Sequence, residues 1–95
     1  MGAGESGWAF DRAVKRVAAL EGVLADYATN VCGLPLRRAD EIQGVTWSIG
    51  GEAMARLVVE ADGPDRLLVH ELALLAPIRR ALRTRHLTIT YTPSP

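Results

Sequence analysis

The chain has 95 residues, equal numbers of basic and acidic side chains (11 of each, net charge zero) and 48% hydrophobic residues. This length suits one domain around a single core, and this composition excludes disorder as the default state. A lone cysteine, Cys32, excludes an internal disulfide framework and a zinc site built from cysteines.

A helix is predicted in the first third of the chain. Apolar residues recur there in steps of three and four, and charged residues fill the positions between them. The stripe comprises Phe10, Ala13, Val17, Leu20, Leu24, Tyr27 and Val31. Gly33 and Pro35 are expected to end the helix. The stripe covers the chain's own sheet or, alternatively, forms a seam with a second copy through Val17, Leu20 and Leu24.

A charged loop and a β-hairpin are expected next. Residues 34–43 carry charges of both signs and are assigned to a connecting loop. Residues 45–49 (VTWSI) alternate apolar and polar side chains, which predicts a half-buried strand. Gly50 and Gly51 mark the hairpin turn.

A three-residue hairpin loop, 50–52, is expected because it pairs apolar residues with one another. This register pairs Ile49 with Ala53, Trp47 with Ala55 and Val45 with Leu57, and continues the core face through Val59 and Ala61. Met54 and Val58 then interrupt the polar outer face, where they are candidate dimer contacts.

The second half of the chain predicts a turn, a helix and a strand. Residues 61–65 (ADGPD) are typical of a turn that starts a helix. The segment 66–84 is rich in Leu, Ala, Glu and Arg, which favours a helix, with a kink or break near Ala76 caused by Pro77. The alternative makes 66–72 a strand and leaves a short helix after Pro77. Residues 86–92 alternate again and predict a strand whose Leu87, Ile89 and Tyr91 face the core.

The expected fold is therefore α+β, a two-layer sandwich in the order helix, strand, strand, kinked helix, strand. Its sheet has three mostly antiparallel strands, with the helices on one face. Residues 1–95 form a single domain, in which 1–6 and 93–95 are expected to fray. Two unpaired sheet edges and an open sheet face invite a second protomer.

No enzymatic motif is present in the sequence. His70 and Glu71 begin a zinc-protease helix motif, but Leu74 stands where the second histidine is needed. A nucleophile elbow, a P-loop and a CxxC pair are missing. We therefore expect no enzyme activity, metal or cofactor, and expect both His70 and His86 to be structural.

An arginine cluster stands out at residues 77–86 (PIRRALRTRH). On a helical wheel Ile78, Ala81 and Leu82 face the core and Arg85 lies at the margin. Arg79, Arg80 and Arg83 fan across the opposite arc. Cations stabilise a helix C-terminus, so the cluster either has this structural role or binds an acidic protein surface, RNA or phosphate. Neutral overall charge and core positions for Trp47 and Tyr91 count against nucleic acid.

The order helix, hairpin, broken helix, strand resembles the type II KH topology. The stretch LLAPIRRALRTRHLTITY is similar in pattern to the kinked helix and last strand of the ribosome-binding factor A family. The resemblance implies binding of structured RNA through the same arginines, although Leu75-Ala76-Pro77 replaces the GxxG loop of KH domains. The alkaline-shock-protein family has a similar element order.

Together these features predict a small, cytoplasmic, non-enzymatic protein that acts as a regulatory or accessory subunit through protein–protein contact. Its predominance of arginine over lysine indicates a GC-rich bacterial source. The expected partners are a second copy of the chain and an acidic protein surface bound by Arg79, Arg80 and Arg83. No sequence segment predicts membrane contact. The alternatives are an RNA-binding protein and a small-ligand domain with a pocket near Trp47 and Tyr91.

Overall fold

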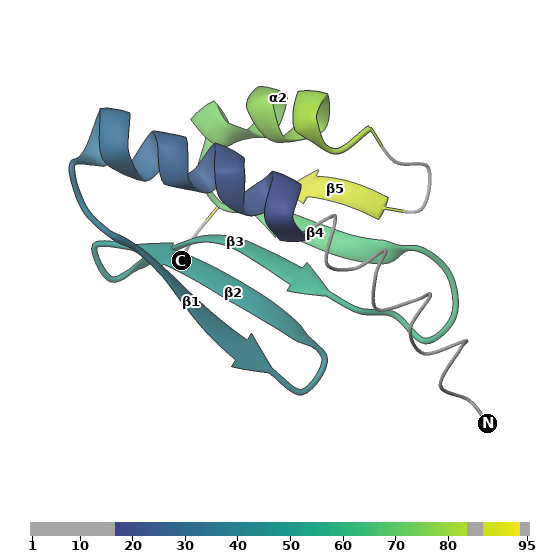
Figure 1. Cartoon of the computed structure of the whole chain (residues 1–95). Helices are drawn as coiled ribbons and strands as arrows, with labels where there is room; N and C mark the ends of the chain where they lie inside the picture. The colour runs from purple at the N-terminus through teal and green to yellow at the C-terminus, as the bar shows by residue number, and fades with distance from the viewer. Residues whose placement is uncertain (1–16, 84–86, 94–95) are drawn as a thin grey trace.

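The computed structural model describes residues 17–83 and 87–93 and has an α+β fold (Figure 1). A helix at residues 17–32 precedes four antiparallel strands, the helix α2 and a final strand. The strands are β1 (Leu36–Glu41), β2 (Gly44–Ile49), β3 (Glu52–Val58), β4 (Asp65–Val69) and β5 (Leu87–Tyr91), and α2 is Leu72–Ala81. They form one sheet in the order β1-β2-β3-β4-β5, in which β5 runs parallel to β4. Both helices cover the same face of the sheet.

The α+β class is confirmed, but the sheet has five strands rather than three. The first helix packs on the sheet through Leu20, Leu24 and Ala28, which are at most 2% exposed. Its last turn is a π-helix, η1 (Ala28–Cys32), and ends at Gly33 with a φ of 67°. Leu20, Leu24 and Ala28 are four residues apart, and in the wider π turn that follows it is Cys32 that packs against the core, while Val31 is 66% exposed.

The loop predicted at 34–43 is wrong, because most of it forms β1. This strand pairs with β2 along its whole length, from Leu36 opposite Ile49 to Glu41 opposite Gly44. Its side chains are exposed on both faces, except for the half-buried Leu36. A strand with no buried face shows no alternation of polar and apolar residues, so the sequence pattern could not reveal it.

The β2–β3 hairpin has the predicted residue pairing in its strands but a two-residue loop instead of the predicted three-residue loop. Trp47 pairs with Ala55 and Val45 with Leu57, as expected, yet Ile49 pairs with Glu52 across a two-residue loop. A β-bulge between these two regions absorbs the additional residue, Met54.

The turn itself consists of Gly50 and Gly51, both with positive φ (61° and 83°), which suits a two-residue hairpin turn. The core face does not continue beyond β3, because this strand ends at Val58. Val59 is 51% exposed and Ala61 is also exposed.

The prediction that a helix begins at residue 66 is wrong. Residues 65–69 form the strand β4, as in the alternative prediction, and α2 begins only at Leu72. β4 lies between β3 and β5, and its Leu67 and Val69 are completely buried. Burial in the middle of the sheet overrides the helix propensity of this segment.

Of the predicted kink or break near Ala76, the break is wrong, since α2 is one continuous helix from Leu72 to Ala81 with Pro77 inside it. Pro77 has no N–H to donate to the carbonyl of Ala73. Ala73 is exposed, so water can serve that carbonyl instead.

The last strand is confirmed, with Leu87 and Ile89 packed against the core. Tyr91, predicted to face the core, is 38% exposed because β5 is an edge strand. Ala81, expected on the core side of its helix, is exposed as well. The predicted fraying of 1–6, the stripe residues Phe10 and Ala13, and the roles of Arg85 and His86 lie outside the described residues.

Two glycines give a direct test of this backbone. A Cβ on Gly44 would clash with the carbonyl oxygen of Leu57, whereas a Cβ on Gly22, within the first helix, meets nothing within 4 Å. We expect Gly44→Ala to destabilise the protein by several kcal/mol, on the order of the cost of forced backbone shifts. Gly22→Ala should stabilise it by about 1 kcal/mol through helix propensity. Urea unfolding measures both changes, and an unchanged midpoint for Gly44→Ala would contradict the β2–β3 pairing.

Candidate interaction surfaces

The arginine cluster lies on the outer side of α2. Leu74, Ile78 and Leu82 are buried and hold one side of the helix against the sheet. At about 100° per residue, Arg79, Arg80 and Arg83 then occupy the opposite arc. All three are exposed, and Arg79 and Arg80 belong to the last helical turn. The predicted placement of these side chains away from the core is therefore seen in the structure.

These arginines differ in their surroundings from three arginines of the sheet. Arg38, Arg56 and Arg66 each have a carboxylate partner within 3.5 Å. Within the described part of the chain, Arg79, Arg80 and Arg83 have no ion pair or side-chain hydrogen bond. Their guanidinium groups are thus accessible to an anionic partner.

The proposed dimer contacts fall into two groups. Leu20 and Leu24 are 1% and 0% exposed in the core of their own chain, and Met54 is 7% exposed. As placed here, these three side chains offer little surface to a second copy. Val17 and Val58 are partly exposed, Val17 beside the core and Val58 on β3. The β-bulge explains why Met54 is buried rather than outward-facing: Met54 is the additional residue in β3, and its side chain joins the core cluster.

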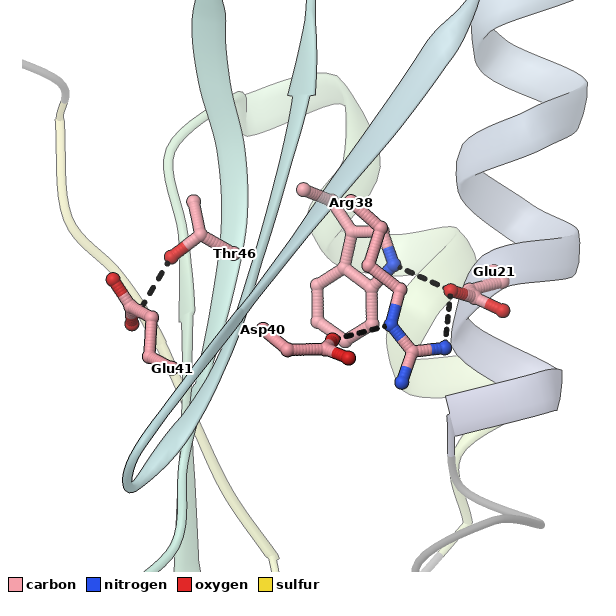
Figure 2. Close-up of polar contacts among 6 residues, drawn as sticks. Glu21, Arg38, Asp40, Glu41 and Thr46 are labelled. Carbon is pink, nitrogen blue, oxygen red and sulfur yellow. Dashed lines mark hydrogen bonds and ion pairs between the residues drawn. The ribbon is translucent and has the colours of Figure 1, made fainter.

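A polar network joins the first helix to the sheet (Figure 2). The indole N–H of Trp47, a completely buried residue, donates to Glu21 Oε2 at 2.8 Å. Arg38 Nη1 contacts the same oxygen at 3.2 Å, and Arg38 Nε donates to Asp40 Oδ1 at 2.8 Å. The hydrogen bond to Asp40 raises the pKa of Arg38, an effect that the Coulombic attraction of Asp40 and Glu21 reinforces and that desolvation opposes. The network fixes β1 to the helix as well as to β2.

The opposite face of the sheet carries a second set of polar contacts. Glu41 Oε1 accepts from Thr46 Oγ1 at 3.4 Å and from Arg56 Nε at 3.2 Å, while Arg66 lies 3.5 Å from Glu60. Figure 2 shows Glu41 and Thr46 on the far side of β1 from Arg38 and Glu21. Both helices lie on the other face, so among the described elements this surface has no covering layer.

An open cavity of about 860 Å³ lies between the first helix and the β1–β2 hairpin. Its apolar wall includes Val17, Val45 and Leu57, and Glu21, Arg38 and Asp40 also line it. The small-ligand alternative placed its pocket near Trp47 and Tyr91. Neither residue lines this cavity, and Trp47 is completely buried.

His70 and Glu71 have structural contacts. The backbone N–H of His70 donates to the Met54 carbonyl at 2.8 Å, and its Nδ1 lies 2.7 Å from the Thr92 carbonyl. The Glu71 side chain caps α2 by accepting from the Ala73 N–H at 3.2 Å. Among the described residues, no cluster of His, Cys, Asp and Glu could hold a metal ion.

No protein-family model, curated protein or solved structure matches the chain. The element order behind the KH resemblance also differs, because β1 and β4 are additional strands and α2 is unbroken. Within residues 17–83 and 87–93, no helix is both long and apolar enough to cross a membrane.

Sequence reasoning missed Glu21, Arg38 and the rest of β1. Glu21 looked like one of several charges on a helix, and nothing in the sequence pairs it with Trp47, 26 positions away. The β1 segment did carry a signal, since basic residues precede acidic ones in a symmetric order.

The Trp47–Glu21 contact predicts a graded response to substitution. Glu21→Ala leaves a buried indole N–H without an acceptor, which should lower the free energy of unfolding by about 1–3 kcal/mol. Glu21→Gln keeps an oxygen acceptor and should cost less than half as much. Urea unfolding, with the Trp47 indole proton followed by NMR, measures both. Equal losses for the two variants would show that the contact does not serve the indole.

Proposed function

We propose that this chain is a non-enzymatic interaction module that works as a homodimer and binds an acidic protein surface through Arg79, Arg80 and Arg83. The observation that carries the proposal is the contrast between this exposed cluster and three of the four arginines of the sheet; the fourth, Arg37, also has no carboxylate partner among the described residues. Arg38, Arg56 and Arg66 each have a carboxylate partner, whereas the α2 cluster has none among the described residues. A regulatory or accessory role in the cytoplasm is part of the same proposal.

The distribution of charge supports an acidic partner. Residues 76–95 contain arginines and no acidic residue, although the whole chain is neutral. The net positive charge is thus concentrated at the C-terminal end of the sequence, an arrangement that steers the approach of an oppositely charged surface. Arginine also suits such a contact because its planar fork can bind a carboxylate through two hydrogen bonds.

RNA is the alternative ligand for the same arginines. Trp47, completely buried, is not available to stack on bases, whereas the partly exposed Tyr91 belongs to β5 rather than α2. Recognition of single-stranded RNA usually needs exposed aromatic residues beside the basic ones. An acidic protein surface is therefore the better match to this cluster.

The proposal predicts selective loss of polyanion binding when the cluster is neutralised. We expect Arg79→Gln/Arg80→Gln/Arg83→Gln to weaken binding of fluorescent poly-L-glutamate at least tenfold, because three accessible guanidinium groups are lost. The control Arg56→Gln/Arg66→Gln removes exposed arginines from the open sheet face and should change affinity less than twofold. Fluorescence anisotropy measures both, with a duplex RNA of equal charge in parallel.

Two outcomes would contradict the assignment to acidic proteins. One is an unchanged affinity for poly-L-glutamate in the triple variant. The other is much tighter binding of the RNA, with a steep loss of affinity as salt rises, which would favour the RNA alternative.

A further inference from the structure

Residues 36–42 have a self-complementary order of charges. The segment reads Leu-Arg-Arg-Ala-Asp-Glu-Ile, with Ala39 at its centre. Two basic residues precede the alanine, two acidic residues follow it, and an aliphatic residue lies at each end. When this segment is laid antiparallel against a second copy of itself, every basic residue faces an acidic one.

The structure places this segment at an exposed edge of the sheet. β1 pairs with β2 on one side, and no described strand pairs with its other side. Figure 1 shows β1 at the outer margin of the sheet, away from α2. An edge strand presents unpaired N–H and C=O groups that another strand can bind. Ile42, at the tip of the β1–β2 hairpin, is 103% exposed, so the aliphatic end of the segment is accessible too.

We propose that two copies of this chain associate by antiparallel pairing of their β1 strands about a two-fold axis at Ala39. The two five-stranded sheets then form one continuous sheet of ten strands. Arg38 faces Asp40 of the second copy, Arg37 faces its Glu41, and Leu36 faces its Ile42. The contact is the same from both sides, as a two-fold dimer requires.

The charges select this register over its neighbours. Moving the axis to Arg38 brings two Arg38 side chains together, and moving it to Asp40 brings two carboxylates together. Like charges directly opposite one another in a sheet are unfavourable, whereas opposite charges stabilise the pair. Ala39 at the axis avoids both conflicts.

In this register the helix-covered faces of the two sheets lie on the same side of the combined sheet. Residues directly opposite one another point to the same face of a sheet. Arg38 and Asp40 lie on the helix side, where Arg38 contacts Glu21, and Glu41 lies on the open side with Thr46. Pairing about Ala39 therefore keeps the helices of both copies on one side. A one-residue slip would place them on opposite sides.

The other edge of the sheet is a weaker candidate for the same contact. β5 (LTITY) carries no charge, so its sequence favours no single register. Pairing of β1 with β5 of a second copy would leave two free edges and extend indefinitely rather than close. The two-fold contact through β1 gives a closed dimer with a defined register.

A disulfide across the two-fold axis tests the geometry directly. In Cys32→Ser/Ala39→Cys the two new thiols belong to directly opposite residues, whose Cα atoms lie about 4.5–5.5 Å apart, within reach of a disulfide. Mild oxidation should link most of the protein into dimers.

The matched control is Cys32→Ser/Thr46→Cys, on the neighbouring strand β2. Its thiols would lie three strand spacings apart, roughly 14 Å, and should remain free. Cys32→Ser/Thr90→Cys reports on pairing through β5. The proposal would be overturned if the Thr90→Cys variant formed cross-linked dimers and the Ala39→Cys variant did not.

Charge exchange supplies an independent test without a covalent bond. Arg37→Glu places acids opposite acids, and Glu41→Arg places bases opposite bases, so each variant alone should dissociate at least tenfold more readily. Mixed in equal amounts, the two variants restore opposite charges at both positions and should form a heterodimer. Native mass spectrometry resolves all three species, and circular dichroism checks that each variant is folded, since Glu41→Arg also loses its contact with Arg56.

This inference rests on the homodimer of the proposed function, and its failure is distinguishable from failure of that function. A dimer that persists in both single variants and is not cross-linked at Ala39 overturns the β1 contact and leaves a homodimer in place. A native protein that is monomeric at all concentrations overturns both the β1 contact and the homodimer. Neither result alters the predicted effect of neutralising Arg79, Arg80 and Arg83 on poly-L-glutamate binding.

Discussion

The hydrogen bond from the Trp47 indole to Glu21 is the contact on which the arrangement of this chain depends. Trp47 is among the largest fully buried side chains, and a buried indole N–H without an acceptor is costly. The first helix must therefore lie over β2 in the register that brings Glu21 to the indole. The same carboxylate binds Arg38, which holds β1 beside β2 although β1 buries almost no side chain. The need of the buried Trp47 indole for an acceptor thereby also fixes the position of β1, a polar edge strand.

The resulting molecule has a covered face, an open face and two differently charged regions. The helices bury one side of the sheet, while Arg56 and Arg66 pair with carboxylates on the other. The α2 arginines and β1 belong to separate elements, so the proposed binding of an acidic partner and the proposed association with a second copy would not compete for the same residues. This separation suits a dimer that presents two identical basic surfaces.

The sequence predicted strands in which apolar residues alternate with polar ones, and it missed β1 and β4, whose sequences do not alternate in this way. Trp47 and Ile49 alternate with polar residues, and the strand there was correctly predicted. β1 has no buried face, so its residues looked like a loop. β4 has neighbours on both sides and a Leu-rich sequence, so its composition favoured a helix that burial in the sheet overrides. The site was predicted in part: the exposure of Arg79, Arg80 and Arg83 follows from helix geometry, whereas the partnership of Glu21 with Trp47 depends on tertiary packing.

Amide hydrogen exchange along β1, followed by NMR at two protein concentrations, tests the central claim that a second copy completes this edge. In an antiparallel edge strand, alternate residues direct their N–H groups toward the neighbouring strand and toward solvent. At high concentration we expect slow exchange at both sets of amides in residues 36–42, and on dilution one alternate set should become fast while the other stays protected by β2. Fast exchange of one set at every concentration would contradict the dimer, and fast exchange of both sets would contradict β1 itself.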